Sequence, residues 1–451
     1  MLSTYLSREA ARKLRHGAPW LRREDIVSME GEPEPGTPMQ LKDEDGQVLG
    51  LGDVDLEASY AVRRLGLPDE ALEGLIPRHV RHAFERRARL VDDPRFCRIV
   101  NDDGDGLPGL IVDRYDQHFV VQTLTRSMDA RQEEITRTLG EVTGAASVLL
   151  RNDTPRRQAL GLPTQRPHVM YGTPPRWCRL LEMGARFTVD LTYGRGTGYG
   201  YDHRELRRFL GRTGNGDRVL DVACNVGGLF VHAGRHGAKQ ILAFDGNADA
   251  ADLARENAEA NGLLGRVTVE QGEPLAVLRA LKDTFDLVLL DTLGVASEED
   301  FTEQVRLALR RTRHGGRLLV VGYHPPLALG SFTEAVATAC EQEARIAFRL
   351  ARMGLPPDHP APVGSPGAEY LEAVALDFHP GGFRRDRPQG VRGRPAREGP
   401  RQHRLPRHQE GEGERAQRQG VPLAVPGRQE RHRRRPRLRQ GGRARAHVPE
   451  R

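Results

Sequence analysis

Several residue types and patterns are scarce in this chain of 451 residues, and each scarcity excludes a class of protein. Cysteine occurs only at Cys97, Cys178, Cys224 and Cys340, without the C-x-x-C spacing of zinc sites or the density of a secreted disulfide scaffold. No apolar run approaches the roughly 18 residues of a membrane span, and the N-terminus lacks the apolar core of a signal peptide. We therefore expect a cytoplasmic protein that binds no metal and no membrane.

Charge is unevenly distributed along the chain. The formal net charge is +6, yet residues 381–451 contain 21 arginines, no lysine and seven acidic residues, a net charge of +14, which leaves −8 for residues 1–380. The segment 381–451 also lacks Ile, Tyr, Trp and Cys, so it cannot bury enough apolar surface to offset its ordering entropy. We predict a disordered basic tail. It is either an RNA-binding arm or a solvated appendage, and an out-of-frame reading of a GC-rich gene would also fit.

The rest of the chain divides into three expected domains. Residues 1–72 alternate short apolar runs with turns such as Asp45-Gly46, which predicts a small, mostly β module. Residues 73–191 predict an α+β middle domain, and residues 192–380 alternate strands with helices. The middle domain has an Arg-rich helix expected at about 75–100, a helix near 129–139, and strands at 109–113, 118–123 and 147–151.

The last domain is expected to be α/β, with a mostly parallel sheet covered on both faces, because strands and helices alternate at short intervals. Ligands bind such sheets at the carboxyl ends of the strands. The expected strands are 218–223, 240–245, 266–270, 285–291 and 316–322. Acidic residues lie at or just after the carboxyl ends of four of them, at Asp221, Asp245, Glu273 and Asp291. A single acid after a strand is often only a helix cap, but four together favour a cofactor site.

One motif indicates which cofactor the site binds. The run Val219-Leu220-Asp221-Val222-Ala223-Cys224-Asn225-Val226-Gly227-Gly228 predicts a buried strand, a tight turn and a helix whose amide groups face a ligand. Asp245 follows Asp221 by 24 positions, where such folds place a carboxylate against ribose hydroxyls. The G-x-G-x-x-G fingerprint is absent from this run, where the spacing is Cys-Asn-Val-Gly-Gly, and this disfavours an NAD-dependent oxidoreductase. The motif suits S-adenosylmethionine (SAM), which has no phosphate and whose ammonium end favours a carboxylate such as Asp221.

Further short motifs follow one another along residues 1–380. They are Gly17-Ala18-Pro19-Trp20, Asp105-Gly106-Leu107-Pro108-Gly109-Leu110-Ile111-Val112-Asp113-Arg114-Tyr115, Arg151-Asn152-Asp153, Thr197-Gly198 with Asp202, Arg204 and Arg207, Pro357-Asp358-His359-Pro360, and Glu369-Tyr370-Leu371. In this order they resemble the 23S rRNA cytosine-5 methyltransferases of the RlmI type. The resemblance implies an N-terminal PUA domain, which is a small RNA-binding β barrel, then a middle domain and a Rossmann-like class I methyltransferase domain. Chains of this family normally stop after the last motif, so the basic tail lies outside the resemblance.

The resemblance also implies roles for individual residues. Asp221 and the stretch from Cys224 to Gly228 would contact the methionine end of SAM, with Asn225 and Gly227 in that stretch. Asp245 would hold the ribose, and Glu273, where the family usually has Asp, would lie near the adenine. Asp291 would complete the cofactor site. Contacts with RNA are expected from two basic clusters, represented by Arg15 and Trp20 in the PUA-like part and by Arg204 and Arg207 before the methyltransferase domain; a solvated, charge-balanced face is the alternative.

The catalytic positions depart from the family. Methylation of cytosine C5 uses a cysteine thiolate that adds to C6, and the family carries it in a Cys-Ser-Cys motif. Those cysteines are replaced here by Val321 and Tyr323, and neither side chain is a nucleophile at neutral pH. The family's Asp-Pro-Pro reads Asp291-Thr292-Leu293, which removes the rigidity of the proline pair. Cys224 is expected to pack rather than react, and His324 is either a base or a turn residue.

Two functions remain open on the sequence. The first is a SAM-dependent RNA methyltransferase that transfers directly to a nitrogen or oxygen, with Asp291 as the orienting, catalytic group. The second is a degenerate homologue that binds RNA, SAM or both and transfers nothing. The oligomeric state is left open, with a homodimer as one alternative.

Overall fold

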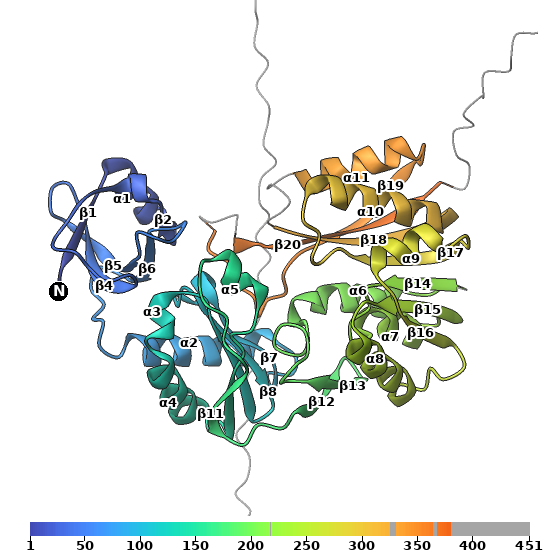
Figure 1. The fold of residues 1–451 in the computed structure, drawn as a ribbon, viewed down its shortest axis with the longest axis horizontal. Helices are drawn as coiled ribbons and strands as arrows, with labels where there is room; N and C mark the ends of the chain where they lie inside the picture. The colour runs from blue at the N-terminus through green and yellow to red at the C-terminus, as the bar shows by residue number, and fades with distance from the viewer. Residues whose placement is uncertain (217, 325–330, 364–367, 380–451) are drawn as a thin grey trace, which may run out of the picture. The chain divides into compact units, whose positions relative to one another are not determined.

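Four β-sheets organise the computed structural model, which describes residues 1–216, 218–324, 331–363 and 368–379 (Figure 1). An N-terminal sheet and a middle sheet are followed by a two-stranded hairpin and a seven-stranded sheet. No helix among the described residues is both long and apolar enough to cross a bilayer. The predicted tail at 381–451 lies outside the described residues.

The N-terminal module is a six-stranded sheet with strand order β2-β6-β5-β4-β1-β3. Its elements are β1 (Ser3–Leu6), α1 (Arg8–Arg15), β2 (Trp20–Leu21), η1 (Arg23–Asp25), β3 (Ile26–Met29), β4 (Thr37–Asp43), β5 (Val48–Val54) and β6 (Val62–Gly66). Helix α1 begins after Ser7, whose Oγ accepts a hydrogen bond from the amide of Ala10 at 3.2 Å. The predicted Asp45-Gly46 turn joins β4 to β5, with Gly46 at φ 80°.

The middle domain carries a five-stranded sheet of order β11-β10-β9-β8-β7. Its elements are α2 (Leu75–Leu90), β7 (Phe96–Asn101), η2 (Asp102–Asp105), β8 (Leu110–Tyr115), β9 (His118–Thr123), α3 (Arg126–Asp129), α4 (Gln132–Thr143), β10 (Ser147–Leu150), α5 (Pro155–Ala159) and β11 (His168–Gly172). The helix expected to reach residue 100 ends at Leu90, so that prediction was wrong at its end. Pro94 has no amide hydrogen and disfavours helix in the residue before it, and the apolar run after it pairs with β8 instead.

A β-hairpin follows the middle domain and lies between β8 and α8 in Figure 1. Its strands are β12 (Trp177–Glu182) and β13 (Ala185–Asp190). The free edge of β13 is closed by two asparagines one helical turn apart on α8 (Ala248–Ala260) and at its end. Asn257 bonds the backbone N–H and C=O of Thr188 at 2.7 and 3.1 Å, and Asn261 does the same for Arg186 at 3.0 and 2.6 Å. These amides replace a neighbouring strand and fix the hairpin to the last domain.

The last domain is a seven-stranded sheet of order β16-β15-β14-β17-β18-β20-β19, in which β14 to β18 are parallel and β20 runs antiparallel to both of its neighbours, β18 and β19. Its further elements are η3 (Tyr201–His203), α6 (Arg204–Thr213), β14 (Arg218–Val222), α7 (Gly228–Arg235), β15 (Gln240–Asp245), β16 (Val267–Gln271), α9 (Pro274–Ala280), β17 (Phe285–Asp291), α10 (Glu298–Arg311), β18 (Thr312–Tyr323), α11 (Ser331–Gln342), β19 (Ala347–Met353) and β20 (Leu371–Phe378). The α/β prediction and its five parallel strands are confirmed, and β19 and β20 were not predicted.

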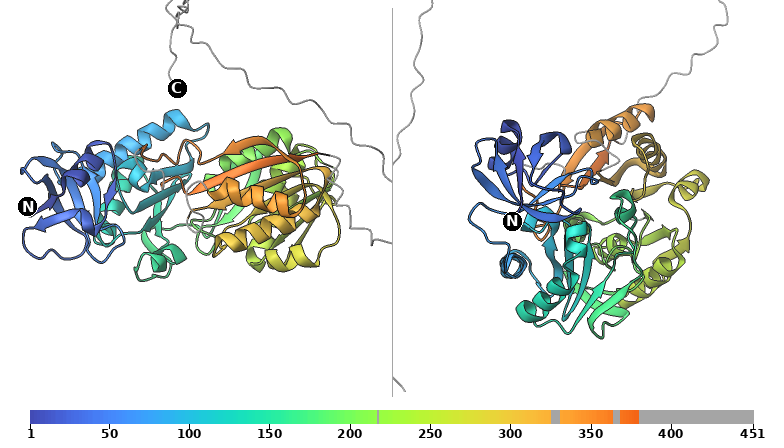
Figure 2. Two further views of the ribbon diagram at one scale, coloured as in Figure 1. Left: turned by 90° about the horizontal axis from the view of Figure 1, so that it is seen from above. Right: turned by 60° about the vertical axis from the view of Figure 1, so that its left-hand side comes forward.

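Both faces of this sheet are buried. Along β17, Leu287 and Leu289 pack with α6, α7 and α8, whereas Val288 and Leu290 pack with α9, α10 and α11. The yellow and orange helices α9 to α11 therefore cover one side of the sheet and the green helices the other (Figure 2). Because both sides of each strand are apolar, the strands appear in the sequence as continuous hydrophobic runs.

Buried charges join the middle domain, the hairpin and the last domain. Arg204 donates to Glu182 of β12 at 3.1 Å, to Asp358 at 2.6 Å and to the carbonyl oxygen of Phe96 at 2.7 Å. Arg207 also donates to Glu182, at 3.1 Å from Nη2. Both guanidinium groups are buried and their partners belong to this chain. The prediction that Arg204 and Arg207 contact RNA phosphates is therefore wrong, because helical spacing alone cannot tell a buried arginine from an exposed one.

The motifs of the sequence analysis meet at the same joint. Arg98 pairs with Asp113 at 2.8 Å, the hydroxyl of Thr197 donates to Asp113 at 2.6 Å, and Tyr370 donates to Asp202 at 3.0 Å. Asn101 of β7 donates to the carbonyl of Pro360 at 3.0 Å, and that carbonyl lies so close to Gly104 that a Cβ there would collide with it. These side chains therefore join the middle domain to the last domain.

We expect Glu182→Gln to lower the free energy of unfolding at pH 7 by about 3–5 kcal/mol, because it leaves two buried guanidinium groups without their charge partner. Chemical denaturation measures this. Glu205→Gln, which removes only a half-exposed pair with Arg208, is the matched control and should change it by less than about 0.5 kcal/mol. Equal effects of the two substitutions would contradict this account of the joint.

Stability should also depend on pH through the same residue. Burial alone would raise the pKa of Glu182, but Arg207 and Arg204 outweigh it and lower the pKa to about 2. The stabilisation is complete above the ordinary glutamate pKa of about 4.3 and is lost as the pH falls toward 2. Unfolding midpoints of the wild type and Glu182→Gln should converge over that range, and a constant difference down to pH 2 would argue against the ionised pair.

Candidate functional site

The four acids of the sequence analysis gather at one edge of the seven-stranded sheet. Asp221 and Asp291 lie at the carboxyl ends of the paired strands β14 and β17, and Asp245 ends β15. Glu273 precedes α9, and its carboxylate lies against Gly246, where a Cβ would come within 2.6 Å of it. The predicted convergence of these side chains is therefore seen in the structure. Their roles in binding remain predictions.

The loop between β14 and α7 has a strained backbone. Ala223 and Asn225 adopt φ of 66° and 49°, a region that side chains other than glycine rarely enter, and Gly227 follows at 86°. A Cβ at Gly227 would lie 2.6 Å from the ring of Phe230, so this position requires glycine twice over. Non-glycine residues in such conformations cluster at ligand sites. The thiol of Cys224 is buried and its pKa is raised by burial, Asp221 and Asp245, which fits packing rather than reactivity.

Asp221 is the most unusual group in the site. It is fully buried, and only its Oδ2 has a partner, the amide of Phe230 at 3.1 Å. Its Oδ1 is buried without a hydrogen-bond partner among the described residues. Burial, and then the proximity of Asp291 and Asp245, raises the pKa of Asp221 well above its usual range. Such an oxygen is costly to leave unpaired, so the site favours a ligand that brings a cationic N–H donor.

Asp245 connects the strained loop to the neighbouring strand. Its Oδ2 accepts from the amide of Asn225 at 2.7 Å and its Oδ1 from the amide of Asn247 at 2.9 Å. Each carboxylate oxygen can accept a second hydrogen bond, so the half-buried group can still receive hydroxyl donors. With Glu273 beside it, this part of the edge is rich in acceptors, which suits a ribose.

Asp291 is bound by two side chains and one backbone amide. It pairs with Arg195 at 3.0 Å, and it accepts from the Tyr323 hydroxyl and the Leu293 amide, each at 3.0 Å. His203 Nε2 lies 2.6 Å from the Tyr323 oxygen and donates to it, since the phenol proton is directed at Asp291. Burial would raise the pKa of Asp291, but Arg195 and His203 outweigh it and lower the pKa. Asp291 is therefore an ionised, immobilised carboxylate and a poor general base.

The two family cysteine positions are chemically inert. Val321 is buried in the sheet beside Asp291. Burial, and then Asp291, raises the pKa of Tyr323 well above its usual value, so the phenol stays protonated. The loop after β17 is nevertheless anchored without the proline pair, because the hydroxyl of Thr292 donates to the carbonyl of Val321 at 2.6 Å. The sequence did not reveal this hydrogen bond, which ties the start of the loop to β18.

Sequence reasoning missed Arg195 and His203 as members of this site. They lie far from Asp291 in the sequence, in the connection between β13 and α6. That segment was noted only for Thr197-Gly198 and Asp202, and nothing in its spacing shows which side chains turn toward the sheet. His324, considered as a base, lies with its Nε2 3.9 Å from Glu372 of β20.

The two residues of the N-terminal module that were predicted to contact RNA each interact with a neighbouring side chain and stay accessible. Trp20 stacks on Tyr60 with ring centroids 3.9 Å apart, and the guanidinium of Arg63 lies 5.5 Å from the Tyr60 centroid. Arg15 is half-exposed and pairs with Asp43 at 2.6 Å. Both Arg15 and Trp20 retain accessible surface, and their contact with RNA stays a prediction.

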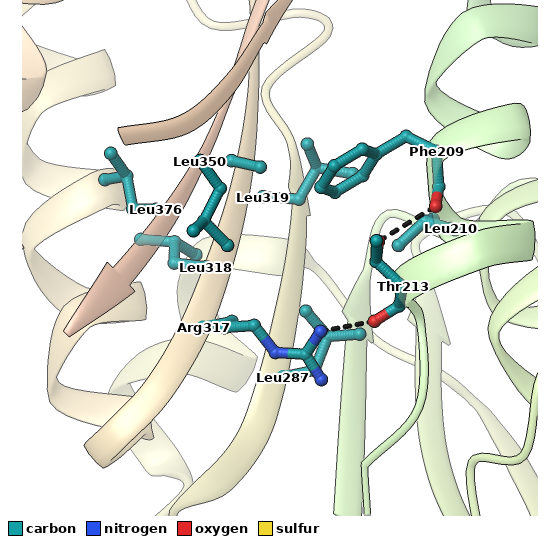
Figure 3. A pocket seen from close by; sticks show the side chains of 10 residues that line it. Phe209, Leu210, Thr213, Leu287, Arg317, Leu318, Leu319, Leu350 and Leu376 are labelled. Carbon is teal, nitrogen blue, oxygen red and sulfur yellow. Dashed lines mark hydrogen bonds between the residues drawn. The ribbon is translucent and has the colours of Figure 1, made fainter. Parts of the chain in front are cut away.

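Two cavities lie away from the acidic edge. One, of about 10 Å³, is lined by α6, β17, β18, β19 and β20 and is framed by Phe209, Arg317 and Leu350 (Figure 3). It has room for no more than about one water molecule. The other, of about 340 Å³, is lined by Leu65, Leu72 and Met128 among others. Neither includes any of the four acids.

Known families match two parts of the chain. A family described as a PUA-like domain matches residues 5–66, and one described as a methyltransferase domain matches residues 219–316. The N-terminal module and the last domain therefore carry the folds that were expected for them.

Relatives and solved structures cover most of the chain. Ribosomal RNA large subunit methyltransferase I of Tolumonas auensis is 27% identical over 405 residues, and that of Photobacterium profundum is 28% identical over 391 residues. Each alignment covers 83% of this chain and 98% of the relative. A candidate SAM-dependent methyltransferase from Streptococcus mutans matches with a TM-score of 0.74 at 17% identity, covering 84% of this chain and all of that one. Another candidate methyltransferase, solved with S-adenosylhomocysteine, matches with a TM-score of 0.72 at 18% identity over 84% of this chain and all of that one.

We expect Gly227→Ala to destabilise the last domain by more than about 2 kcal/mol, since it adds a collision with Phe230 to left-handed backbone strain. Gly262→Ala is the matched control: its φ is 70° and no atom lies within 4 Å of the added Cβ, so it should cost only about 1 kcal/mol. Urea unfolding measures both. A cost at Gly227 no greater than at Gly262 would show that the loop relaxes freely.

Proposed function

We propose, from the premise that this chain is an RlmI-type methyltransferase with a PUA-like domain and a class I methyltransferase domain, that it transfers a methyl group from SAM to large-subunit ribosomal RNA. The relatives named above are ribosomal RNA large subunit methyltransferases, and they align along nearly their whole length. We also propose a cytosolic location, which a ribosomal RNA substrate would support.

The observation that carries the cofactor assignment is the unpaired, buried Oδ1 of Asp221. An α-ammonium group brings both the N–H donor and the positive charge that this oxygen lacks. Asp245 and Glu273 offer hydroxyl and amine acceptors along the same edge. When bound, SAM supplies a methyl group activated by its sulfonium charge. The chain's own part is to hold the two ends of that cofactor and to leave the transferred methyl facing the RNA.

The RNA atom that accepts the methyl group is proposed to be a nitrogen or an oxygen. Attack through C5 of cytosine requires a thiolate, and the corresponding positions hold Val321 and a protonated Tyr323. A ring nitrogen or a hydroxyl oxygen provides its own lone pair, so the transfer needs only that the chain orient this atom and that a base or water accept the proton that a hydroxyl or N–H group releases. Asp291, Tyr323 and His203 are suited to this because hydrogen bonds hold all three.

A second candidate function is favoured by one observation. Arg195 neutralises the carboxylate of Asp291, which the sequence analysis had taken as the catalytic group. A homologue that binds RNA, SAM or both without transferring a methyl group would show the same pairing. Measured methyl transfer separates the two functions.

Calorimetric titration with SAM tests the cofactor site. We expect the affinity to rise with pH, because the ammonium group binds ionised Asp221 and the pKa of Asp221 is raised above the ordinary value near 4. Asp221→Asn should weaken binding by about tenfold or more and remove that pH dependence. Asp245→Ala should also weaken binding, whereas Asp249→Ala, at an exposed position on α8, should not. Unchanged affinity in Asp221→Asn would contradict the assignment.

Tritiated methyl transfer to total ribosomal RNA tests the reaction and its chemistry. We expect label in large-subunit RNA, on a nitrogen or oxygen atom, and none in 5-methylcytosine. RNA that contains 5-fluorocytidine traps enzymes that use a cysteine adduct, and it should form no covalent complex with this protein. Strong 5-methylcytosine formation would overturn the direct-transfer mechanism, and SAM binding with no label anywhere would support the non-catalytic alternative.

A further inference from the structure

Three side chains form an exposed stack beside the hairpin. The guanidinium carbon of Arg176 lies 4.4 Å from the ring centroid of Trp177 and 5.1 Å from that of Tyr193. Trp177 is 46% exposed and Tyr193 63% exposed, which is unusual for large aromatic residues. Nothing in the fold or in the proposed methyl transfer requires these rings to face solvent.

The stack is held in place before any partner arrives. Asp190, at the end of β13, is buried and accepts from Arg176 Nε at 2.9 Å. Its other oxygen accepts from the amides of Thr192 and Tyr193 at 2.8 and 2.9 Å, which fixes the turn that presents the tyrosine. A prearranged surface loses little conformational entropy on binding.

The rest of the exposed hairpin face is positively charged. Alternation along β12 places Arg179 on the same side as Trp177, and Arg186 lies on β13 opposite Leu181. Both arginines are exposed, and no carboxylate within the described parts of the chain forms an ion pair with either. Glu182 points to the buried side, where it binds Arg204 and Arg207. Aromatic faces flanked by free guanidinium groups match the bases and phosphates of single-stranded nucleic acid.

The stack is also close to the acidic edge of the sheet. Tyr193 precedes Arg195 by two residues, and Arg195 pairs with Asp291 at 3.0 Å. Two residues of chain span at most about 7 Å, and an arginine side chain adds about as much again. A nucleotide bound at Asp291 would therefore lie within a few nucleotides of a base resting on Trp177 or Tyr193.

We propose that Arg176, Trp177 and Tyr193 form a stacking platform for unpaired bases of the RNA that flank the methylated nucleotide. This rests on the proposed function for the existence of a target nucleotide, but the binding of a single strand to the platform can be tested without it. A second copy of this chain is a poorer fit, because a two-fold contact through this face would bring Arg176, Arg179 and Arg186 against their own counterparts.

Fluorescence tests the platform directly, because the chain has only two tryptophans. Trp20→Phe leaves Trp177 as the single reporter. Short single-stranded oligoadenylate should quench its emission in a salt-dependent way, and a blunt RNA duplex of the same length should quench it far less. Adding Tyr193→Ala to that variant should weaken the binding. Oligoadenylate that binds without changing the Trp177 emission would overturn the proposal.

Kinetics on ribosomal RNA test its role in the reaction. We expect Trp177→Ala to raise KM for RNA by about 5- to 150-fold, the range for loss of one stacked base, with kcat and SAM affinity nearly unchanged. Trp177→Phe should recover most of the loss because it restores a ring. Phe348→Ala is the matched control: this phenylalanine is 53% exposed on β19, at the far edge of the sheet, and should have no effect.

The outcomes separate this proposal from the proposed function. Normal RNA kinetics in Trp177→Ala, with methyl transfer intact, would overturn the platform and leave the methyltransferase standing. Quenching by oligoadenylate with no methyl transfer would support the platform and contradict the proposed methyltransferase function. If Trp177→Ala instead dissociates a dimer in sedimentation experiments and leaves KM for RNA unchanged, the face is a protein interface and the proposal fails.

Discussion

The packing of the middle domain, the hairpin and the last domain against one another depends on the contacts of the buried Arg204 guanidinium group. It binds a carboxylate of the hairpin, a carboxylate near the C-terminal end of the described chain, and a backbone carbonyl of the middle domain. Leaving a buried charge without one of its partners costs several kcal/mol. Moving any one of these segments away would leave Arg204 without a partner, so the contacts hold all three in position. Arg207 and Arg87 repeat this pattern with Glu182 and Asp105.

That joint determines what faces the acidic edge of the sheet. With Glu182 fixed between α6 and α7, the hairpin has one buried and one exposed face, and Asn257 and Asn261 close its free edge. The chain then leaves β13 through the turn at Asp190 and brings Arg195 to Asp291. The aromatic stack and the carboxylate network are thus parts of one rigid connection between two domains.

Within this frame, the chemistry of the site differs from that expected for the family it resembles. Where the family carries a thiolate, a protonated phenol bridges Asp291 and His203 here, and where the family has two prolines, Thr292 ties the loop to Val321. The half of the edge formed by Asp221, Asp245 and Glu273 keeps the acceptors that suit a nucleoside with an ammonium group. Under the proposed function, Asp221, Asp245 and Glu273 would bind the methyl donor, and Asp291, Tyr323 and His203 would face the RNA atom that receives the methyl group.

The sequence by itself determined the sheet, its order of elements and the four acids, because buried parallel strands leave continuous apolar runs and carboxyl ends share one edge. It also showed that the two cysteines of the family are replaced, because the residue type at a position can be read without a structure. It placed the end of α2 wrongly and left out β19 and β20. Only the tertiary structure decided that Arg204 and Arg207 are buried, that Arg195 and His203 reach Asp291, and that Trp177 and Tyr193 face solvent around one arginine. These pairings join residues that lie from about 20 to more than 150 positions apart, as Arg204 does with Glu182 and with Asp358, and local spacing does not show which side chains such segments bring together.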